Sequence, residues 1–346
     1  MIDLTYQFIN LTDLLRHAGP ASLNLLEIRA EGHVGIRDRQ IVLVGAPIDE
    51  CAGQRGCRMG PDAYRTAGLA EMLSALGYGV LDTGNLKPVG VGPLEAPNPV
   101  LKNYPAYVGW TRSLHARASD LGCSTVFPIY LGGDHAMAAG TVSGQARAAA
   151  AQGRPLFVLW LDAHSDFHTL QSTDSGNLHG TPLAFLCGLP GFDDLLDGPL
   201  QHALDPQNVE ILGVRSIDEA ERRLLIDHGV GVSDMRRIDE TGITALLAPF
   251  LERVRSNNGL LHVSLDVDFL DPDIAPAVGT TVPGGTSFRE AHLVMEMLHD
   301  SGLVTSLDLV ELNPFLDERG KTARLMVDLA GSLFGRRVFD RPTISF

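Results

Sequence analysis

The chain has 346 residues, of which 45% are hydrophobic and 20% are charged. This apolar content suffices for a folded core and excludes a disordered, collagen-like or small disulfide-stapled protein. The 42 acidic and 27 basic side chains give a formal net charge of −15, so we expect neither nucleic acid nor an anionic membrane surface as a partner, because both would repel the chain.

Short apolar runs alternate with longer stretches of helical spacing from residue 40 onward. The expected strands are residues 41–45, 126–131, 156–161, 209–214, 260–267 and 303–310. The expected helices are residues 61–75, 135–152, 218–227, 241–255, 287–299 and 321–334. This alternation predicts a mainly parallel, doubly wound α/β sheet, because continuous apolar runs are typical of strands covered on both faces.

No internal repeat or low-complexity tract divides the chain. We therefore expect one domain over residues 1–346, with an N-terminal extension (1–35) and a C-terminal tail (338–346) whose roles the sequence does not indicate. The four cysteines form no CxxC pair, no basic and apolar leader opens the chain, and no apolar run is long enough to span a bilayer. These features predict reduced thiols and a cytoplasmic protein that does not enter a membrane.

Side chains that can bind metal follow three of the expected strands. Alternate residues of an extended chain point to the same side, and the carboxyl ends of parallel strands meet at one edge of the sheet. We therefore expect six side chains to converge there: His135, Asp162, His164, Asp166, Asp266 and Asp268.

Four carboxylates and two imidazoles at one place would be severely unfavourable without cations. Any one of the six taken alone would be interpreted as a turn cap or a surface group, but together at strand ends they indicate a site for two divalent ions. An oxygen-rich set with some imidazole and no thiolate favours Mn²⁺, while zinc, cobalt, nickel and iron stay open. Two such ions about 3.5–4 Å apart would turn a bridging water into a hydroxide nucleophile, so we expect metal-assisted hydrolysis.

The motifs GGDHA (132–136), DAHSD (162–166) and SLDVDFLDP (264–272) resemble those of the ureohydrolase family, which includes arginases, agmatinases and other guanidino hydrolases. The likeness extends from GAPIDECAGQRGCRMGP (45–61) to VELNP (310–314). It implies a three-layer α/β sandwich, a dinuclear manganese centre and a homo-oligomer, either a trimer or a hexamer. The loop SGNLHG (175–180) is most similar to that of arginases, which implies hydrolysis of the guanidinium group of L-arginine to urea and ornithine.

The resemblance also implies roles for single residues. Asp166 would orient the metal-bridging hydroxide, His179 would carry protons to the leaving amine, and Glu311 would hold the guanidinium group. The implied substrate contacts are His168, Ser175, Asp218, Glu221 and Thr280. From the sequence pattern alone, the two acidic members of this set would be first-turn carboxylates favoured by a helix dipole.

Three departures from the arginase pattern keep other substrates open. His168 stands where arginases usually have Asn, Ser216 replaces a common Asp, and Thr181 gives an HGTP ending similar to that of agmatinases. Agmatine, guanidinobutyrate and guanidinopropionate are therefore the nearest alternatives, with formimidoylglutamate and a metal-dependent deacetylation less favoured. A metal-binding sensor without catalysis is less favoured because all the expected site residues are present together. A nucleotide-binding protein is poorly supported, because the glycine-rich loop 53–60 carries no phosphate-binding signature.

Overall fold

The computed structural model describes residues 39–337. The predicted N-terminal extension (1–35) and C-terminal tail (338–346) lie outside the described residues, and the single domain stays a prediction. Within the described range the strands form one eight-stranded sheet with the order β2-β1-β3-β8-β7-β4-β5-β6. The strands are β1 Ile41–Ala46, β2 Val80–Asn85, β3 Phe127–Gly132, β4 Leu156–Leu161, β5 Val209–Val214, β6 Gly231–Asp234, β7 Leu260–Asp266 and β8 Val304–Val310.

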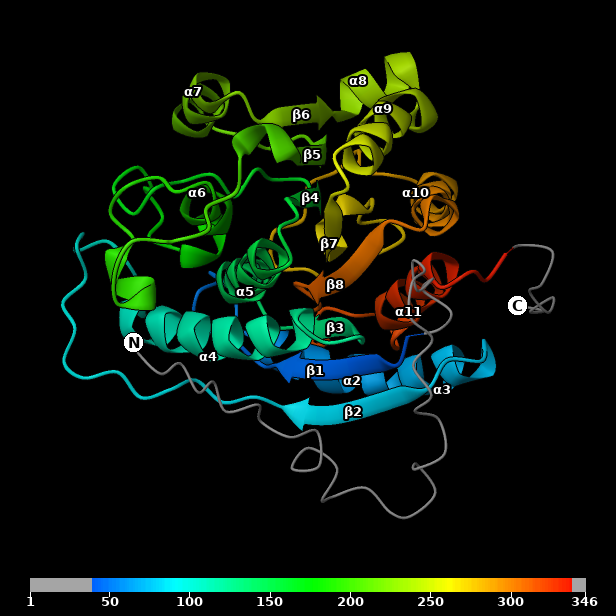
Figure 1. Cartoon of the computed structure of the whole chain (residues 1–346), viewed down its shortest axis with the longest axis horizontal. Coiled ribbons are helices and arrows are strands. Elements are labelled where there is room, and N and C mark those ends of the chain that lie inside the picture. The colour runs from blue at the N-terminus through cyan, green and yellow to red at the C-terminus, as the bar shows by residue number, and fades with distance from the viewer. Residues whose placement is uncertain (1–38, 338–346) are drawn as a thin grey trace, which may run out of the picture. The chain divides into compact units, whose positions relative to one another are not determined.

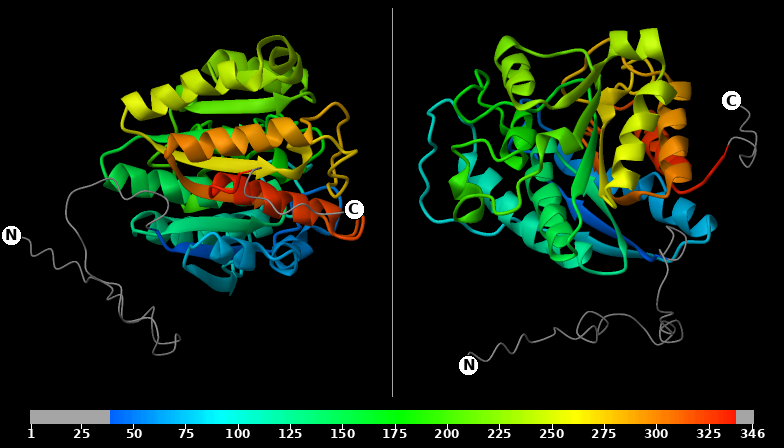
Figure 2. Two further views of the ribbon diagram at one scale, coloured as in Figure 1. Left: turned by 90° about the vertical axis from the view of Figure 1, so that its right-hand side faces the viewer. Right: turned by 45° about the horizontal axis from the view of Figure 1, so that its top comes forward.

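Every neighbouring pair in this sheet is parallel, so the described strands run in one direction (Figure 2). Helices cover both faces and make a three-layer sandwich (Figure 1). The helices are α2 Gly60–Thr66, α3 Leu69–Ala75, α4 Tyr104–Gly122, α5 Ala138–Ala151, α6 Pro182–Leu186, α7 Glu219–His228, α8 Met235–Thr241, α9 Ile243–Ser256, α10 Phe288–Ser301 and α11 Lys321–Leu333. The predicted three-layer α/β fold is confirmed.

Successive side chains of each strand point to opposite faces of the sheet and therefore contribute to two separate hydrophobic cores. Ile41 and Leu43 of β1 pack with residues of α2, α3 and α8 to α11, whereas Val42 and Val44 pack with residues of α4 to α7. Because both faces of the inner strands are covered, β1, β3 and β4 are buried at every position. This double burial explains why these strands are continuous apolar runs in the sequence.

All six predicted strands are confirmed to within a residue or two at their ends, but the sequence pattern missed the two edge strands. Strand β2 is mostly exposed and has the sequence VLDTGN, and β6 is only four residues long, so neither forms a buried apolar run. The prediction of one helix over residues 61–75 is wrong in detail. Gly68 has φ +87° and divides that stretch into α2 and α3, because a left-handed residue cannot continue a right-handed helix.

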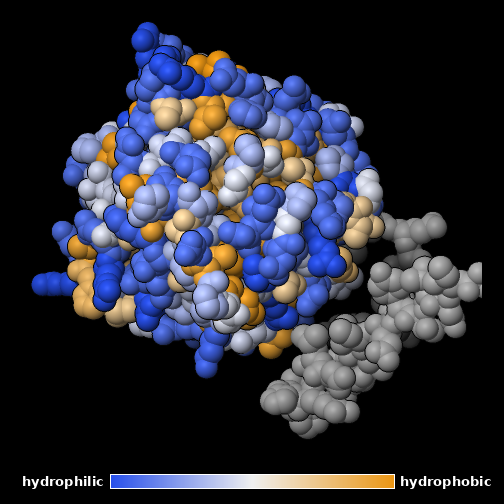
Figure 3. All heavy atoms as spheres, turned by 90° about the vertical axis from the view of Figure 1, so that its left-hand side faces the viewer, coloured by the Kyte–Doolittle hydropathy of each residue, from blue (hydrophilic) through white to orange (hydrophobic). Residues whose placement is uncertain are grey.

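Among residues 39–337, no helix is both long and apolar enough to cross a lipid bilayer. On the face of the molecule shown in Figure 3, hydrophilic residues predominate and apolar residues are scattered in small groups. All four cysteines are free thiols, and two of them, Cys51 and Cys57, are buried.

Candidate metal centre

The expected ligands lie at the carboxyl edge of the sheet, at or after the ends of strands β3, β4 and β7. Strands β3, β8, β7 and β4 are neighbours in that order, so the segments that follow them meet although they are far apart in the sequence. A short 3-10 helix (His135–Met137) follows β3, and the Asp134 side chain caps it by accepting from the backbone N–H of Ala136. This cap turns His135 towards the ends of β4 and β7.

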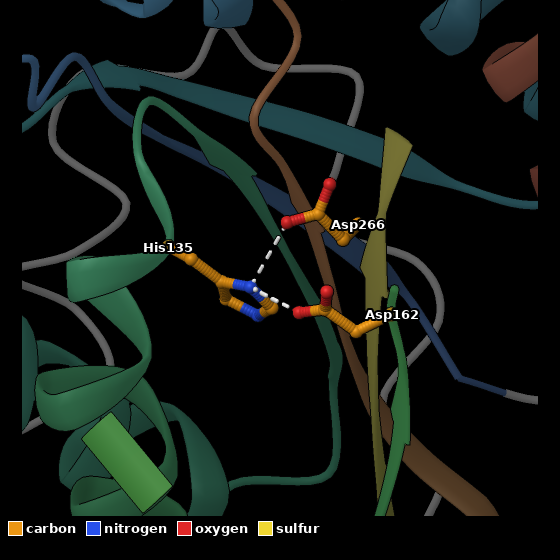
Figure 4. Close-up of side chains that lie close together, drawn as sticks. All are labelled: His135, Asp162 and Asp266. Carbon is orange, nitrogen blue, oxygen red and sulfur yellow. Dashed lines mark ion pairs between the residues drawn. The ribbon is translucent and has the colours of Figure 1, made fainter. Parts of the chain in front are cut away.

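The first group of ligands surrounds the imidazole of His135. Its Nδ1 lies 3.0 Å from Asp162 Oδ2, 3.1 Å from Asp266 Oδ2 and 3.2 Å from Asp166 Oδ2. Figure 4 shows His135, Asp162 and Asp266 pointing towards one another from three different segments. All four side chains are buried, so their oxygens and the ring nitrogen enclose one small polar volume.

The second group lies on the other side of Asp162. Its Oδ1 is 3.4 Å from Nδ1 of His164, which is itself 3.0 Å from Asp268 Oδ2. One ligand atom from each of His135, Asp162 and Asp266 lies within 4.8 Å of the others, and the same holds for Asp162, His164 and Asp268. Asp162 therefore directs one oxygen into each group, as a carboxylate that bridges two ions would.

The charges in this centre perturb one another strongly. Burial favours the neutral form of Asp162, but His135 and His164 outweigh burial and hold the pKa of that carboxyl below its usual range. Burial and the charge of Asp162 raise the pKa of Asp166 to about 6, and burial and Asp268 raise the pKa of Asp266 well above its usual value. The protein alone therefore does not hold four carboxylates ionised here, and added positive charge would.

The bonding of His135 tests whether these residues fit metal ions. Its Nδ1 is buried and makes no hydrogen bond to any residue in the described range, while Nε2 lies 2.8 Å from the hydroxyl of Ser264. Donation from Nε2 to Ser264 leaves the Nδ1 lone pair directed at three carboxylates, the arrangement expected of a metal-binding histidine with an outer hydrogen-bond partner. The residues fit two divalent cations.

Two outer partners of the ligands were not anticipated from the sequence. Ser264 is one, and Trp160 is the other. The indole N–H of Trp160 donates to Asp162 Oδ2 at 2.9 Å, and its ring stacks on His135 at 4.0 Å between centroids. Ser264 lies two positions before Asp266 on β7, and Trp160 lies two positions before Asp162, which directly follows β4. The two-residue alternation that identified the ligands therefore also pointed to these partners.

Glu311 and His179 form a pair beside the first group. Glu311 follows β8 with φ +63°, an unusual conformation for a residue with a side chain. Its Oε1 accepts from the backbone N–H of His135 at 2.8 Å and lies 2.9 Å from Nδ1 of His179. Burial disfavours the cation of His179, but Glu311, Asp166 and Asp134 outweigh burial and raise the pKa of His179 to about 9.

Three of the five predicted substrate contacts lie together at the start of α7. Asp218 and Glu221 form a capping box, each side chain bonding the other's backbone N–H. Nε2 of His168 lies 3.0 Å from Asp218 Oδ2 and 3.7 Å from Glu221 Oε2. Glu221 is a first-turn carboxylate as expected, whereas Asp218 is the N-cap residue just before α7. Both oxygens of Glu221 already accept hydrogen bonds, and Asp218 Oδ2 is the oxygen that faces the imidazole.

The other two predicted contacts have different surroundings. The hydroxyl of Ser175 bonds within its own loop, 3.2 Å from the backbone N–H of Asn177. Thr280 donates its hydroxyl to Asp268 Oδ2 at 3.2 Å, next to the second metal group. Among the described residues, no hydrogen bond joins Ser175 or Thr280 to the His168 cluster, and their contact with a substrate stays a prediction.

Comparisons with known proteins agree with this geometry. Residues 39–335 match the model of the arginase family. The chain is 60% identical over 304 residues to an arginase of Agrobacterium fabrum, covering 88% of this chain and 93% of that protein. It is also similar to the crystal structure of an arginase from Bacillus subtilis, with 40% identity, a TM-score of 0.78, and coverage of 87% and 100%. An arginase of Entamoeba histolytica, solved with L-ornithine, is 25% identical with a TM-score of 0.77 and coverage of 86% and 99%.

Proposed function

The chain belongs to the arginase family, and on that premise we propose that it hydrolyses the guanidinium group of L-arginine to urea and ornithine. One observation carries the proposal: two ligand groups share Asp162, and the His179–Glu311 pair lies beside them. A dinuclear hydrolase of C–N bonds needs this combination of two adjacent cation sites and a carboxylate for the guanidinium group.

The oxygen-rich ligand sets support Mn²⁺ in both sites, because neither set contains a thiolate. When bound, two such ions supply a water molecule whose pKa is lowered towards about 7, so that it can act as a nucleophile at neutral pH. Asp166 lies 3.2 Å from His135 Nδ1, next to the first group. We assign it the role of a ligand whose second oxygen orients the nucleophile.

Glu311 is the proposed acceptor of the guanidinium group. Two donors occupy its Oε1, which leaves Oε2 for the N–H groups of a planar cation. His179 is the proposed proton carrier, because Glu311 beside it favours the protonated imidazole, which can donate to a leaving amine. His179→Ala should therefore lower kcat while elemental analysis still finds two ions per chain, and an unchanged pH–rate profile would reject this role.

The cluster of His168, Asp218 and Glu221 is the proposed site for the amino-acid end of arginine. Asp218 Oδ2 suits an α-ammonium group, the buried Glu221 adds negative charge beside it, and an imidazole N–H suits an α-carboxylate. Thr181 does not bear on this choice. Its buried hydroxyl donates to the carbonyl of Leu178 and lies 3.2 Å from the hydroxyl of Tyr107 inside the fold, so the HGTP ending has a structural role here.

A second candidate is a guanidino acid without the α-ammonium group. The observation that favours it is the 3.0 Å contact between His168 and Asp218, because a carboxylate already paired with an imidazole is less available to an ammonium group. Agmatine, which has no carboxylate, would leave the imidazole without its expected partner.

A substrate panel tests these assignments. The chelated protein would be reloaded with Mn²⁺, Zn²⁺, Co²⁺ or Ni²⁺ and assayed for urea release from L-arginine, agmatine, guanidinobutyrate and guanidinopropionate. We expect the highest kcat/KM for L-arginine with Mn²⁺. A preference of tenfold or more for guanidinobutyrate would establish the second candidate, and no urea from any substrate would contradict both.

We further propose a cytoplasmic homo-oligomer, a trimer or a hexamer. The free cysteines support a reducing compartment, and the oligomer is expected from family resemblance. Light scattering on the purified full-length chain would determine the number of subunits, and a monomer at micromolar concentration would contradict the assembly.

A further inference from the structure

A buried thiol lies against the side of Glu311 that faces away from His179. The Sγ atom of Cys57 is 3.5 Å from Glu311 Oε2, and the two residues are exposed by only 1% and 2%. Among residues 39–337, Cys57 is the one side chain within hydrogen-bond distance of Oε2, whereas Oε1 has two partners. The thiol therefore adjoins the oxygen that we assign to the guanidinium group.

The loop that follows β1 holds this thiol in place. The backbone N–H of Gly56 donates to Asp49 Oδ1 at 2.8 Å, and the amide of Asn313 donates to the carbonyl of Arg55 at 3.0 Å. Gly56 has φ +136°, and a Cβ atom there would lie 1.9 Å from Asn313 Oδ1. Only glycine therefore lets this loop close against the segment after β8, and Cys57 is the next residue.

The thiol carries its proton under all working conditions. Burial raises its pKa far above the usual range, and the nearby carboxylates of Glu311 and Asp134 raise it further. A protonated thiol is a weak donor, and the ionised carboxylate is the acceptor that it faces. The contact is therefore an S–H donation to Oε2.

We propose that Cys57 is a positioning residue for the guanidinium site, whose S–H group fixes the rotation of the Glu311 carboxylate and so the direction of the Oε2 lone pairs. The proposal rests on the guanidinium role given to Glu311 above. Oε1 is anchored by His135 and His179, so the remaining freedom of the carboxylate is a swing of Oε2. The thiol limits this swing and leaves the second lone pair of Oε2 directed at the substrate.

Substitutions at Cys57 distinguish the effect of losing the hydrogen-bond donor from the effect of changing the side-chain volume. Cys57→Val and Cys57→Ala remove the donor with a larger and a smaller side chain, whereas Cys57→Ser keeps a donor. We expect the first two variants to raise KM for L-arginine by about threefold to tenfold, the effect of losing one weak hydrogen bond. Because the bond acts equally on bound substrate and transition state, kcat should stay within twofold. Cys57→Ser should restore KM to within twofold of the unmodified protein.

Guanidinium chloride at low millimolar concentration, against sodium chloride, serves as a second probe. Its inhibition constant should rise by the same factor as KM, because it occupies only the guanidinium end of the site. Cys51→Val is the matched control, since Cys51 is equally buried in the same loop and its thiol has no hydrogen bond among the described residues. Its KM should stay within twofold of the unmodified value.

Unchanged KM in Cys57→Val and Cys57→Ala, with a lowered melting temperature, would overturn the proposal and leave Cys57 as a space-filling residue. An equal rise of KM in Cys57→Ser would also overturn it, because the donor would then be irrelevant. If the unmodified, manganese-loaded protein releases no urea from L-arginine, the proposed function itself fails, and this result is distinct from either outcome in the variants.

Discussion

The hydroxyl of Ser264 offers a test of how the outer partners of the ligands support the metal centre. Ser264 is fully buried on β7, and its Oγ lies 2.8 Å from Nε2 of His135. In Ser264→Ala the ring N–H loses its acceptor in a place that excludes water. The imidazole then rotates to find another partner or keeps an unsatisfied donor, and either response weakens the ligand at Nδ1.

The expected loss of metal affinity follows from the burial of the His135 N–H group. Leaving a buried donor unsatisfied costs about 1–3 kcal/mol. At about 1.4 kcal/mol per factor of ten, the affinity for the ion that His135 binds should fall by roughly tenfold to one-hundredfold. The ion held by His164 should be affected less, because His164 does not contact Ser264.

Ser306→Ala is the matched control. Ser306 is also fully buried and lies 2.8 Å from a histidine nitrogen, Nδ1 of His262, on the neighbouring strand β8. Both variants should lower the free energy of unfolding, but only Ser264→Ala should weaken metal binding in a competition with a chromophoric chelator. Equal metal affinities in the two variants would refute the reasoning, since the hydroxyl would then serve only stability.

Three other variants test separate parts of the site. Asp162→Ala should remove both ions together, because Asp162 belongs to both groups, and an elemental analysis that still finds two ions per chain would contradict the shared ligand. In the chelated protein the pKa of His179 is raised to about 9, so the stability that its cation contributes is complete below about pH 6.5 and is lost as the pH rises through about 9. His179→Gln should therefore lower the free energy of unfolding most near pH 6 and least above pH 9, and a deficit that grows with pH would be inconsistent with a raised pKa. Gly56→Ala places a Cβ atom 1.9 Å from Asn313 Oδ1 at φ +136°, so urea unfolding should show a loss of about 1–3 kcal/mol, and an unchanged midpoint would show that the loop tolerates a side chain.

The edge strands and α4 show where sequence patterns were insufficient. Strand β2 (VLDTGN) is mostly exposed, and its apolar and polar residues do not alternate regularly. Its pairing with β1 therefore depends on the neighbouring strand and not on its own composition. Helix α4 spans Tyr104–Gly122 although Asn103 before it provides no side-chain cap. Gly109 interrupts its 3.6-residue apolar pattern. The glycine is needed because a Cβ atom at this position would lie 2.5 Å from the carbonyl oxygen of Val89.

The predicted substrate-binding residues likewise combine a feature that the local sequence shows with one that only the fold produces. The capping box of Asp218 and Glu221 is a local pattern, readable from residues three apart at a helix start. That His168 turns its Nε2 towards this box is not local, because it depends on the loop after β4 passing the start of α7. As substrate contacts, all three residues were indicated by the sequence only through family resemblance.

The amino-acid sequence by itself determined the alternation of strands and helices, the placement of carboxylates and imidazoles at strand ends, and hence the class of site. These follow from periods of two and 3.6 residues, which act over a few neighbours. Only the tertiary structure decided which distant residues meet: Ser264 with His135 across 129 residues, and Cys57 with Glu311 across 254. Such contacts depend on the strand order β3-β8-β7-β4 and on the register between strands, which the packing of two helical layers selects for the whole domain at once.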